Sequence, residues 1–360
     1  MVPVGARYEE LVSIYMKTFE DSVKNINDET QYWLVRTMGG DFYKHYTDND
    51  FIAIGYNEIT LQDFKTLSPK KEIAKKVLQE MFKARREDAN KARYAASQMY
   101  RFVREMKIGD IVIIPSSSSH KVAFGRIDSD VYEDSTNIYA TYGCPFAKRR
   151  KITWLKTSIK TYLPAELQLI FGSRHIISEI TGYGAFIDQY LNDFYTKGDK
   201  TFLVLRVKQQ DELSADDFTL ISDLMSLFND FSEETKWGIT SKDIKMKASV
   251  QSPGDILLFA QSPWALAIIG LIILFLKGGN YNLDIFNVVK LNLNLPSTSQ
   301  GIALLIDKLN KLLNDSSKRK LMDSLKNKLD NMEIDAPDAI AKLLPMLQDT
   351  PDKDEEKNDE

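Results

Sequence analysis

The chain has 360 residues and a mass of 41.2 kDa, which is enough for two or three domains. Its charged fraction of 27%, apolar fraction of 43% and mean hydropathy of −0.29 exclude a collagen-like, fully disordered or multi-pass membrane protein. The net charge of −4 comes from residues 349–360, which carry −5 and leave a near-neutral body. The single cysteine, Cys144, excludes an internal disulfide and a cysteine-based zinc site. Residues 2–15 lack an apolar stretch, which predicts that no signal peptide is present.

The first part of the chain reads as a helix followed by a mixed domain. Apolar side chains at spacings of three and four predict an N-terminal helix within residues 1–30. Ser68 and Pro69 form a typical helix start, and a helix rich in Lys, Arg, Glu and Ala is expected from there to residue 106. Strands are predicted around this helical stretch, at 31–38, 50–56, 111–114, 122–127, 137–142 and 151–155. Residues 31–156 are therefore predicted to form an α+β domain, a small barrel or curled sheet with a helical insert.

A second, smaller α+β domain is predicted at residues 157–250, where it would connect two other parts of the chain. Its first forty residues look mostly helical, and 200–208 is a clear strand. Ser214, with Asp217 three residues later, is the predicted N-cap of a helix that runs to about residue 231. A further strand is expected at 243–250.

Average hydropathy hides one apolar segment within residues 251–280. Residues 256–276 contain no charge, and about 20 apolar residues are what a bilayer core requires. We expect this segment to enter the membrane, as a span or a re-entrant loop, with a buried core helix as the alternative reading. In the membrane reading, Trp264 and Lys277 are interfacial anchors, and Gln261 and Ser262 face the lumen of a pore. Gly270 lies within this apolar segment.

The C-terminal region, 281–347, is predicted to begin with an extended stretch at 281–295 and to continue as amphipathic helices. Leucine and methionine side chains recur at spacings of three and four between residues 305 and 332, which is typical of a short coiled-coil seam. Two readings stay open, a helical hairpin that packs on itself and an oligomerisation element. Residues 348–360 are expected to form a disordered acidic tail.

The sequence contains little that indicates catalysis. The three histidines, His45, His120 and His175, do not form a metal-binding spacing, and no phosphate-binding glycine loop is present. The sequence Glu234-Thr235-Lys236 is the nearest approach to a nuclease motif, but no strand pattern surrounds it. We therefore predict a binding protein rather than an enzyme, with no cofactor and no metal.

Aromatic and basic residues are concentrated in the first α+β domain. Aromatic rings can stack on bases and neighbouring cations can neutralise phosphates, so this combination favours nucleotide or single-strand binding. The competing interpretation is that the rings belong to the core and that Arg149, Arg150 and Lys151 lie on a solvated face. The residues concerned are Trp33, Arg36, Tyr43, Tyr56, Tyr132, Tyr142 and Trp154.

Three segments taken together resemble a known family. They are YWLVRTMGGDFYKHYTDNDFIAIGY at 32–56, IGDIVIIP at 108–115, and the stretch from VAFGRIDSDVYED to KRRKITWL at 122–155. In order and spacing they are similar to the PUA-like, EVE-related domain at the N-terminus of bacterial restriction and anti-phage proteins. Tyr56 stands where that family usually has tryptophan, so one wall of a ligand cage differs here.

The resemblance implies that nucleotides or modified bases are bound in a pocket between the sheet and the helical insert. The residues that it implies for this pocket are Trp33, Arg36, Gly39, Gly40, Tyr56, Tyr132 and Trp154, with Arg149 and Arg150 for phosphate. The order of a sensor, a connector and one hydrophobic segment also looks like the plan of Hailong-type membrane channel effectors, whose sensor binds a DNA oligomer.

The sequence thus predicts an anti-phage defence effector in the inner (cytoplasmic) membrane, with its sensor domain in the cytoplasm. A nucleotide or an oligonucleotide, single-stranded DNA included, would gate a homo-oligomeric pore in the lipid bilayer, and a partner enzyme would synthesise the signal. The alternative is a soluble nucleic-acid-binding specificity module of a restriction-type system. A nuclease with an unrecognised site is the third hypothesis.

Overall fold

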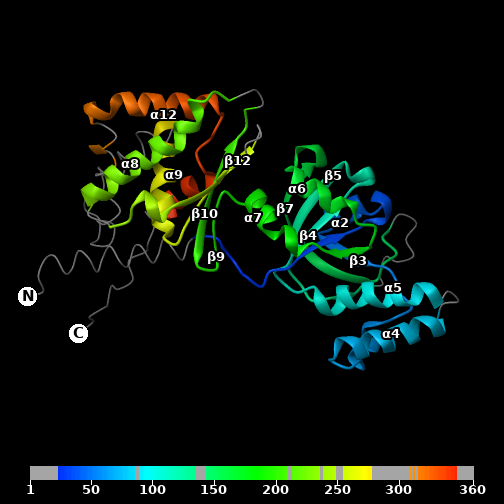
Figure 1. The fold of residues 1–360 in the computed structure, drawn as a ribbon. Helices are drawn as coiled ribbons and strands as arrows, with labels where there is room; N and C mark the ends of the chain where they lie inside the picture. Colours follow the sequence, from blue (N-terminus) through cyan, green and yellow to red (C-terminus); the bar gives the residue numbers. More distant parts are fainter. Residues whose placement is uncertain are drawn as a thin grey trace, which may run out of the picture. The chain divides into compact units, whose positions relative to one another are not determined.

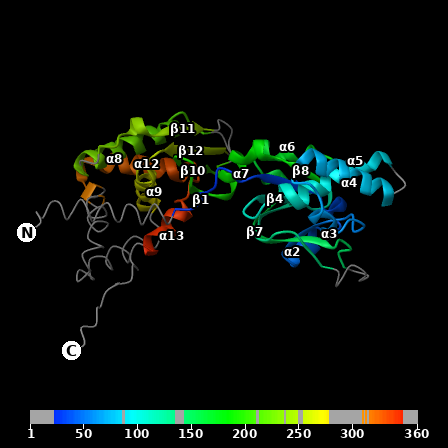
Figure 2. The same ribbon diagram turned by 90° about the horizontal axis from the view of Figure 1, so that it is seen from below.

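The computed structural model describes residues 23–85, 89–134, 143–209, 213–235, 238–248, 254–277, 309, 311–312 and 315–346. The chain divides into two compact units. We call residues 29–191 the central unit, and the remaining residues, which come from both ends of the chain, the terminal unit. The elements of both units are labelled in Figures 1 and 2.

The central unit is built on a seven-stranded, curled sheet with the order β3-β7-β5-β4-β2-β8, and β6 pairs with the edge of β7. Only the β2–β4 pair is parallel among these ladders. The strands are β2 (Tyr32–Val35), β3 (Phe51–Ile54), β4 (Ile111–Pro115), β5 (Lys121–Ile127), β6 (Tyr132–Glu133), β7 (Lys148–Ile159) and β8 (Ile177–Glu179). This sheet confirms the predicted α+β fold with a curled sheet.

Both faces of this sheet are buried in the middle, which explains why β2 reads as a continuous apolar run. Successive side chains of β2 alternate between two clusters, since Trp33 and Val35 enter one and Tyr32 and Leu34 the other. The first cluster is closed by the helical insert, and the second by α6 (Ala165–Leu169) and α7 (Gly184–Leu191).

The helical insert consists of α4 (Lys71–Arg85), α5 (Ala89–Tyr100) and the π-helix η2 (Arg101–Glu105). In α4 the buried residues Ala74, Leu78 and Phe82 are four apart, so they lie on one face toward the core. Figure 1 shows α4 and α5 side by side. Short elements complete the unit: η1 (Met38–Gly40), α2 (Tyr43–Asp48), α3 (Leu61–Lys65), η3 (Ser117–Ser119), η4 (Lys160–Tyr162), η5 (Ile170–Gly172) and η6 (Thr181–Tyr183).

The unit boundaries differ from the predicted ones. The expected boundary at residue 156 falls inside β7, because β7 is twelve residues long and continues to Ile159. The predicted connector, 157–250, is divided between the two units at residue 191. The predicted helix within 1–30, the strand at 137–142, the stretch at 281–295 and the tail from 348 lie largely or wholly outside the described residues.

The terminal unit contains a five-stranded sheet with the order β1-β9-β10-β12-β11. The β1–β9 pair is parallel and the other pairs are antiparallel. The strands are β1 (Asn25–Ile26), β9 (Phe194–Lys197), β10 (Lys200–Val207), β11 (Lys245–Ala248) and β12 (Gly254–Ala260). The helices are η7 (Asp217–Thr219), α8 (Leu220–Thr235), η8 (Ser241–Asp243), α9 (Pro263–Lys277), η9 (Ser316–Lys318), α12 (Arg319–Asn331) and α13 (Asp338–Met346).

The apolar segment 256–276 is divided between two elements, which gives the predicted single membrane segment no support. Its first part belongs to β12, which pairs with β10 and β11, and its second part is α9, a helix of 15 residues. Ten residues of α9 are buried, and all of them except Gly270 and Leu274 join one core with α8 and α12. Among the described residues, no helix is both long and apolar enough to cross a membrane. The hydropathy of α9 therefore matches the alternative reading, a helix inside a protein core.

The residues assigned to the membrane have structural positions in this core. Trp264 is buried, and a Cβ on Gly270 would lie 2.8 Å from Cγ1 of Ile340 on α13, so α9 and α13 approach closely there. Lys277 forms an ion pair with Asp330 at 2.7 Å. Gln261 and Ser262 form the turn between β12 and α9. Neither the anchor role nor the lumen role has support from these positions.

The predicted leucine seam packs within the terminal unit. Leu309, Leu312, Met322, Leu325 and Leu329 all belong to the core cluster that contains α8 and α9. The seam residues are thus buried within the chain, as in the predicted helical hairpin, but their core also includes α8 and α9. Oligomerisation through the same residues stays a prediction.

Candidate functional site

Two of the predicted site residues, Trp33 and Arg36, hold the central unit together. Trp33 is 1% exposed, and its Nε1 donates to Oδ2 of Asp110 at 2.9 Å. Asp110 also accepts from the backbone of Gln31, so this pair fixes the start of β2. The Arg36 guanidinium donates to the carbonyls of Phe171 and Ser173, and burial lowers its pKa. Trp33 thus offers no ring face to a ligand, and Nη2 of Arg36 is used within the protein.

Gly39 and Gly40 allow two loops to pack closely. Both have positive φ, 71° and 113°, a region that favours glycine. A Cβ on Gly40 would overlap the backbone of Ser117 in η3, whereas a Cβ on Gly39 would meet nothing within 4 Å. Gly40 is therefore required by the contact between η1 and η3, and Gly39 by its backbone conformation.

Arg150 is a buried cap for the π-helix η2. Its side chain is 1% exposed and donates to the carbonyls of Phe102 and Met106 at 2.9 Å each, and of Val103 at 3.3 Å. These are carbonyls of the last helical turn, which have no partner within a helix. Burial lowers the pKa of Arg150 to about 10. The guanidinium thus serves backbone carbonyls at the place where the resemblance implied phosphate.

Arg149 is also engaged within the protein. It forms an ion pair with Asp134, donates to the carbonyls of Phe146 and Cys144, and lies over the ring of Phe51 with its Cζ 4.5 Å from the centroid. Only 7% of its side chain is exposed. Tyr132 is its cross-strand neighbour and is half-buried, and burial raises the pKa of the Tyr132 phenol.

Trp154 lies in a separate part of the sheet. It is six residues beyond Lys148 on β7, which corresponds to ~20 Å along the strand. Its ring occupies the space that Gly125 leaves open at a bulge in β5, since a Cβ there would be 2.8 Å from Cε3 of Trp154. Its Nε1 is buried and has no hydrogen-bond partner among the residues that the structure describes. The structure therefore does not bring Trp154 together with Tyr56.

Tyr56 is the predicted residue that lies between the sheet and the insert. Its φ is 68°, an outlier for a bulky residue and a sign of strain held by the surroundings. The ring meets Phe82 of α4 edge-on, with 5.4 Å between centroids. The Tyr56 carbonyl accepts from Nζ of Lys148 at 3.2 Å and from the backbone of Ile59 at 3.2 Å.

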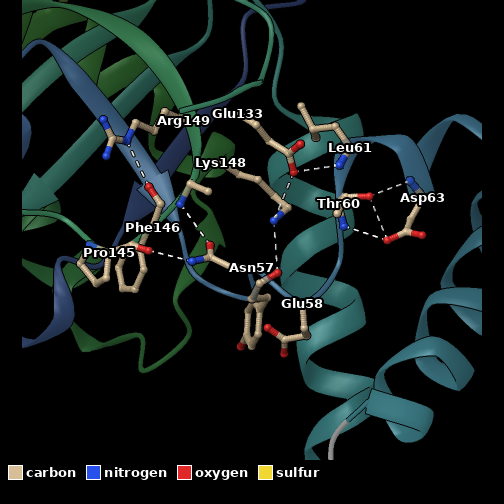
Figure 3. A network of polar contacts seen from close by, with 12 residues as sticks. Asn57, Glu58, Thr60, Leu61, Asp63, Glu133, Pro145, Phe146, Lys148 and Arg149 are labelled. Atoms are coloured by element: carbon tan, nitrogen blue, oxygen red, sulfur yellow. Dashed lines mark hydrogen bonds and ion pairs between the residues drawn. The ribbon is translucent and has the colours of Figure 1, made fainter. Parts of the chain in front are cut away.

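Lys148 was not among the predicted site residues, although it belongs to the same basic run. Its side chain is fully buried, and Nζ lies 3.7 Å from Oε1 of Glu133. Burial lowers the pKa of Lys148, while the nearby carboxylates of Glu133, Glu58 and Asp63 oppose that shift. Figure 3 shows Lys148 and Glu133 directed toward each other, with Arg149 directed away from them. Because side chains alternate along β7, Lys148 and Arg149 serve opposite faces.

The loop around this group is held by a network of backbone contacts (Figure 3). The amide of Asn57 donates to the carbonyl of Pro145 at 2.7 Å and accepts from the backbone of Ala147 at 3.0 Å. Glu133 Oε1 accepts from the backbone N–H of Leu61 at 3.0 Å, which ties β6 to the start of α3. Thr60 and Asp63 form a reciprocal cap on α3.

Tyr56, Lys148 and Glu133, with the supporting Asn57, form what we call the β3–α3 corner. The corner combines an aromatic ring, a buried ammonium and a carboxylate that is 36% exposed. The second carboxylate oxygen, Oε2, has no hydrogen bond or ion pair among the described residues, so it can accept hydrogen bonds from a ligand. Among the described residues, no group of His, Cys, Asp and Glu side chains could hold a metal ion.

Comparison with known proteins gives one match. Residues 32–168 match a family described as a domain of unknown function, DUF8426. This stretch contains β2 to β7 and ends in α6, and thus the β3–α3 corner. No curated protein and no solved structure matches the chain.

Proposed function

We propose that the central unit recognises a nucleobase, free or within a nucleic acid, at the β3–α3 corner. The observation that carries this proposal is the strained Tyr56, whose conformation is held by the buried ammonium of Lys148. Backbone strain of this kind is concentrated at ligand sites, where the surrounding contacts compensate for it.

The charges at the corner favour a base over a phosphate. Three carboxylates, Glu58, Asp63 and Glu133, act on Lys148, so a phosphate would be repelled there. A carboxylate such as Glu133 accepts from the exocyclic amino group of a base, as Glu and Asp do when they contact cytosine. The Tyr56 ring would stack on the base. The resemblance to PUA-like, EVE-related domains supports the same ligand class.

In this proposal the chain is a binding protein in defence against foreign nucleic acid, as in the specificity-module alternative. The membrane pore, the homo-oligomer, the inner-membrane location and the signal-synthesising partner stay predictions. They draw no support from α9, because its apolar face is taken up by the core of the terminal unit.

The test measures binding of the full chain to the four deoxynucleosides and to 5-methyl-deoxycytidine by calorimetry. Tyr56→Gly removes the ring and also removes the strain, because glycine adopts positive φ without cost. We expect this variant to keep its melting temperature within a few degrees and to lose binding roughly tenfold or more.

Glu133→Gln keeps the shape of the side chain and removes its charge. We expect it to weaken binding of bases with an amino group roughly tenfold, and to affect thymidine less. Tyr162→Ala, at a tyrosine that is 76% exposed, and Glu166→Gln are the matched controls. Unchanged affinity in both Tyr56→Gly and Glu133→Gln would remove the corner as a base-binding site.

A further inference from the structure

The outer face of the terminal-unit sheet carries a column of three aromatic rings. Tyr195 of β9 pairs with Phe202 of β10, and Phe202 pairs with Phe259 of β12. The ring centroids are 4.9 Å and 6.0 Å apart, and the ring planes differ by only 16° and 29°. The three rings thus follow one another across three adjacent strands, nearly parallel.

These rings are not part of the core on the other side of the sheet. Leu203, Leu205 and Val207 alternate with Phe202 along β10 and belong to the core cluster with α8, α9 and α12, whereas the three rings do not. Tyr195 is buried, while Phe202 and Phe259 are partly exposed. Phe259 is the last ring of the column.

Beyond Phe259 the column ends above β11, a short edge strand whose four residues are all exposed. Lys245 stands opposite Phe259, and Lys247 stands opposite Leu257 on the same face. At the hairpin between β9 and β10, Lys200 pairs with Lys197, again on the face that carries the rings. Four lysines therefore border this aromatic column.

We propose that this face, made of Phe202, Phe259, Lys245 and Lys247, binds a single-stranded nucleic acid. A base stacks on the exposed parts of the Phe202 and Phe259 rings, beside the Lys245 side chain, and the adjoining phosphates meet Lys245 and Lys247. Stacking on aromatic rings next to a basic border is the general mode of single-strand binding, and it is tolerant of sequence. A duplex keeps its bases stacked inside and does not present them to the column. This surface belongs to the terminal unit and the β3–α3 corner to the central unit, and the proposal does not depend on the corner.

The experiment measures the affinity of the full chain for fluorescein-labelled dT15 and rU15 by anisotropy, over a range of salt concentrations. Phe259→Leu keeps an apolar side chain on the sheet but removes the stacking surface, and we expect about a tenfold loss of affinity. Phe218→Leu, at a phenylalanine that is 58% exposed beside α8, is the matched control and should change nothing.

The double variant Lys245→Gln with Lys247→Gln tests the phosphate contacts. Each phosphate contact on a single strand contributes ~0.7 to the slope of log K against log salt, so the slope should fall by about 1.4. The control is Lys320→Gln with Lys326→Gln. It removes two positive charges from α12 instead of from β11, and it should leave the slope unchanged.

Photocrosslinking distinguishes this surface from the corner in the central unit. An oligomer that carries 5-iododeoxyuridine should label a peptide that contains Phe202 or Phe259, and Tyr56→Gly should not alter that label. Three outcomes would each overturn the proposal. They are equal affinity for duplex and single strand, unchanged affinity in Phe259→Leu, and crosslinks confined to residues 29–191. The dT15 and rU15 arms show whether DNA or RNA is preferred.

Discussion

Two segments of opposite composition are both buried in this protein. The first three residues of β7, Lys148, Arg149 and Arg150, are cationic, and the 15 residues of α9 are almost entirely apolar. The basic run looks like a solvated face and the apolar run looks like a membrane segment. In the structure the first lies at 0–6% exposure in the central unit, and most of the second lies in the core of the terminal unit.

The two segments differ in the kind of neighbour that each needs in order to be buried. The side chains of α9 need only apolar neighbours, which α8, α12, α13 and the sheet provide. The cations of β7 need acceptors, and the end of η2, the loop before β7 and Glu133 supply them. Burial of a charge is therefore specified by its partners, which composition alone does not indicate.

The largest expected effect comes from removing one of these cations. Arg150→Met leaves the buried carbonyls of η2 without a donor, so we expect the central unit to lose about 3–5 kcal/mol of unfolding free energy. Hydrogen exchange of β4 and β5 amides measures the loss within that unit. Arg126→Met is the control, because that side chain is 51% exposed. A change below about 1 kcal/mol would mean that Arg150 does not cap η2.

An intermediate effect is expected from overpacking α9. Gly270→Val places side-chain atoms where Ile340 of α13 lies, and we expect the terminal unit to lose about 1–3 kcal/mol. The double variant with Ile340→Ala should recover much of that loss, which hydrogen exchange of β10 and β12 amides would show. Gly172→Ala in the central unit is the control, since nothing lies within 4 Å of a Cβ at that position. Equal destabilisation in the single and double variants would contradict the contact between α9 and α13.

The smallest effect concerns an ion pair near the surface, which contrasts with the buried cations. The hydrogen bond from Arg85 lowers the pKa of Asp63 to about 2. Because the folded pKa lies below the ordinary value near 4, the stabilisation is present above about pH 4 and is lost as pH falls toward 2.

Arg85→Gln tests the direction of this pH dependence of stability. We expect its melting temperature to be lower than that of the parent by about 1–2 °C at pH 6, and the two temperatures to converge near pH 2. Lys83→Gln, which removes an exposed charge two residues away, should show no such convergence. A difference that grows as the pH falls would contradict the pairing of Arg85 with Asp63.

Much of the secondary structure followed from local patterns. The predicted strands 111–114, 122–127 and 200–208 correspond to β4, β5 and β10 within one or two residues. Ser214 and Asp217 form the reciprocal hydrogen bonds that their spacing predicted, at the start of η7 and α8. The start of β7 was missed, because three successive cations favour a solvated segment unless their partners are known.

The candidate site was less predictable. Tyr56 was recognised through its place in a family pattern, but its positive φ is not visible in the sequence. Lys148 and Glu133 lie fifteen residues apart and meet only through the β6–β7 ladder. Trp33 and Arg36 were chosen for their residue types, and the structure uses those types for internal hydrogen bonds. Side-chain chemistry alone thus did not separate the candidate binding residues from the structural ones.

The parallel pairing of β1 with β9 has a consequence for synthesis on the ribosome. Asn25 and Thr196 are partners in this ladder, and Lys24 bonds to Asn192 at 2.6 Å across 168 residues. The terminal unit therefore cannot close its sheet until the whole intervening stretch has emerged, whereas residues 29–191 are able to fold as soon as they are made. The two points where the chain leaves and re-enters the terminal unit lie on neighbouring strands. Because of this, residues 29–191 are able to be replaced by another domain during evolution without a change in the five-stranded sheet of the terminal unit.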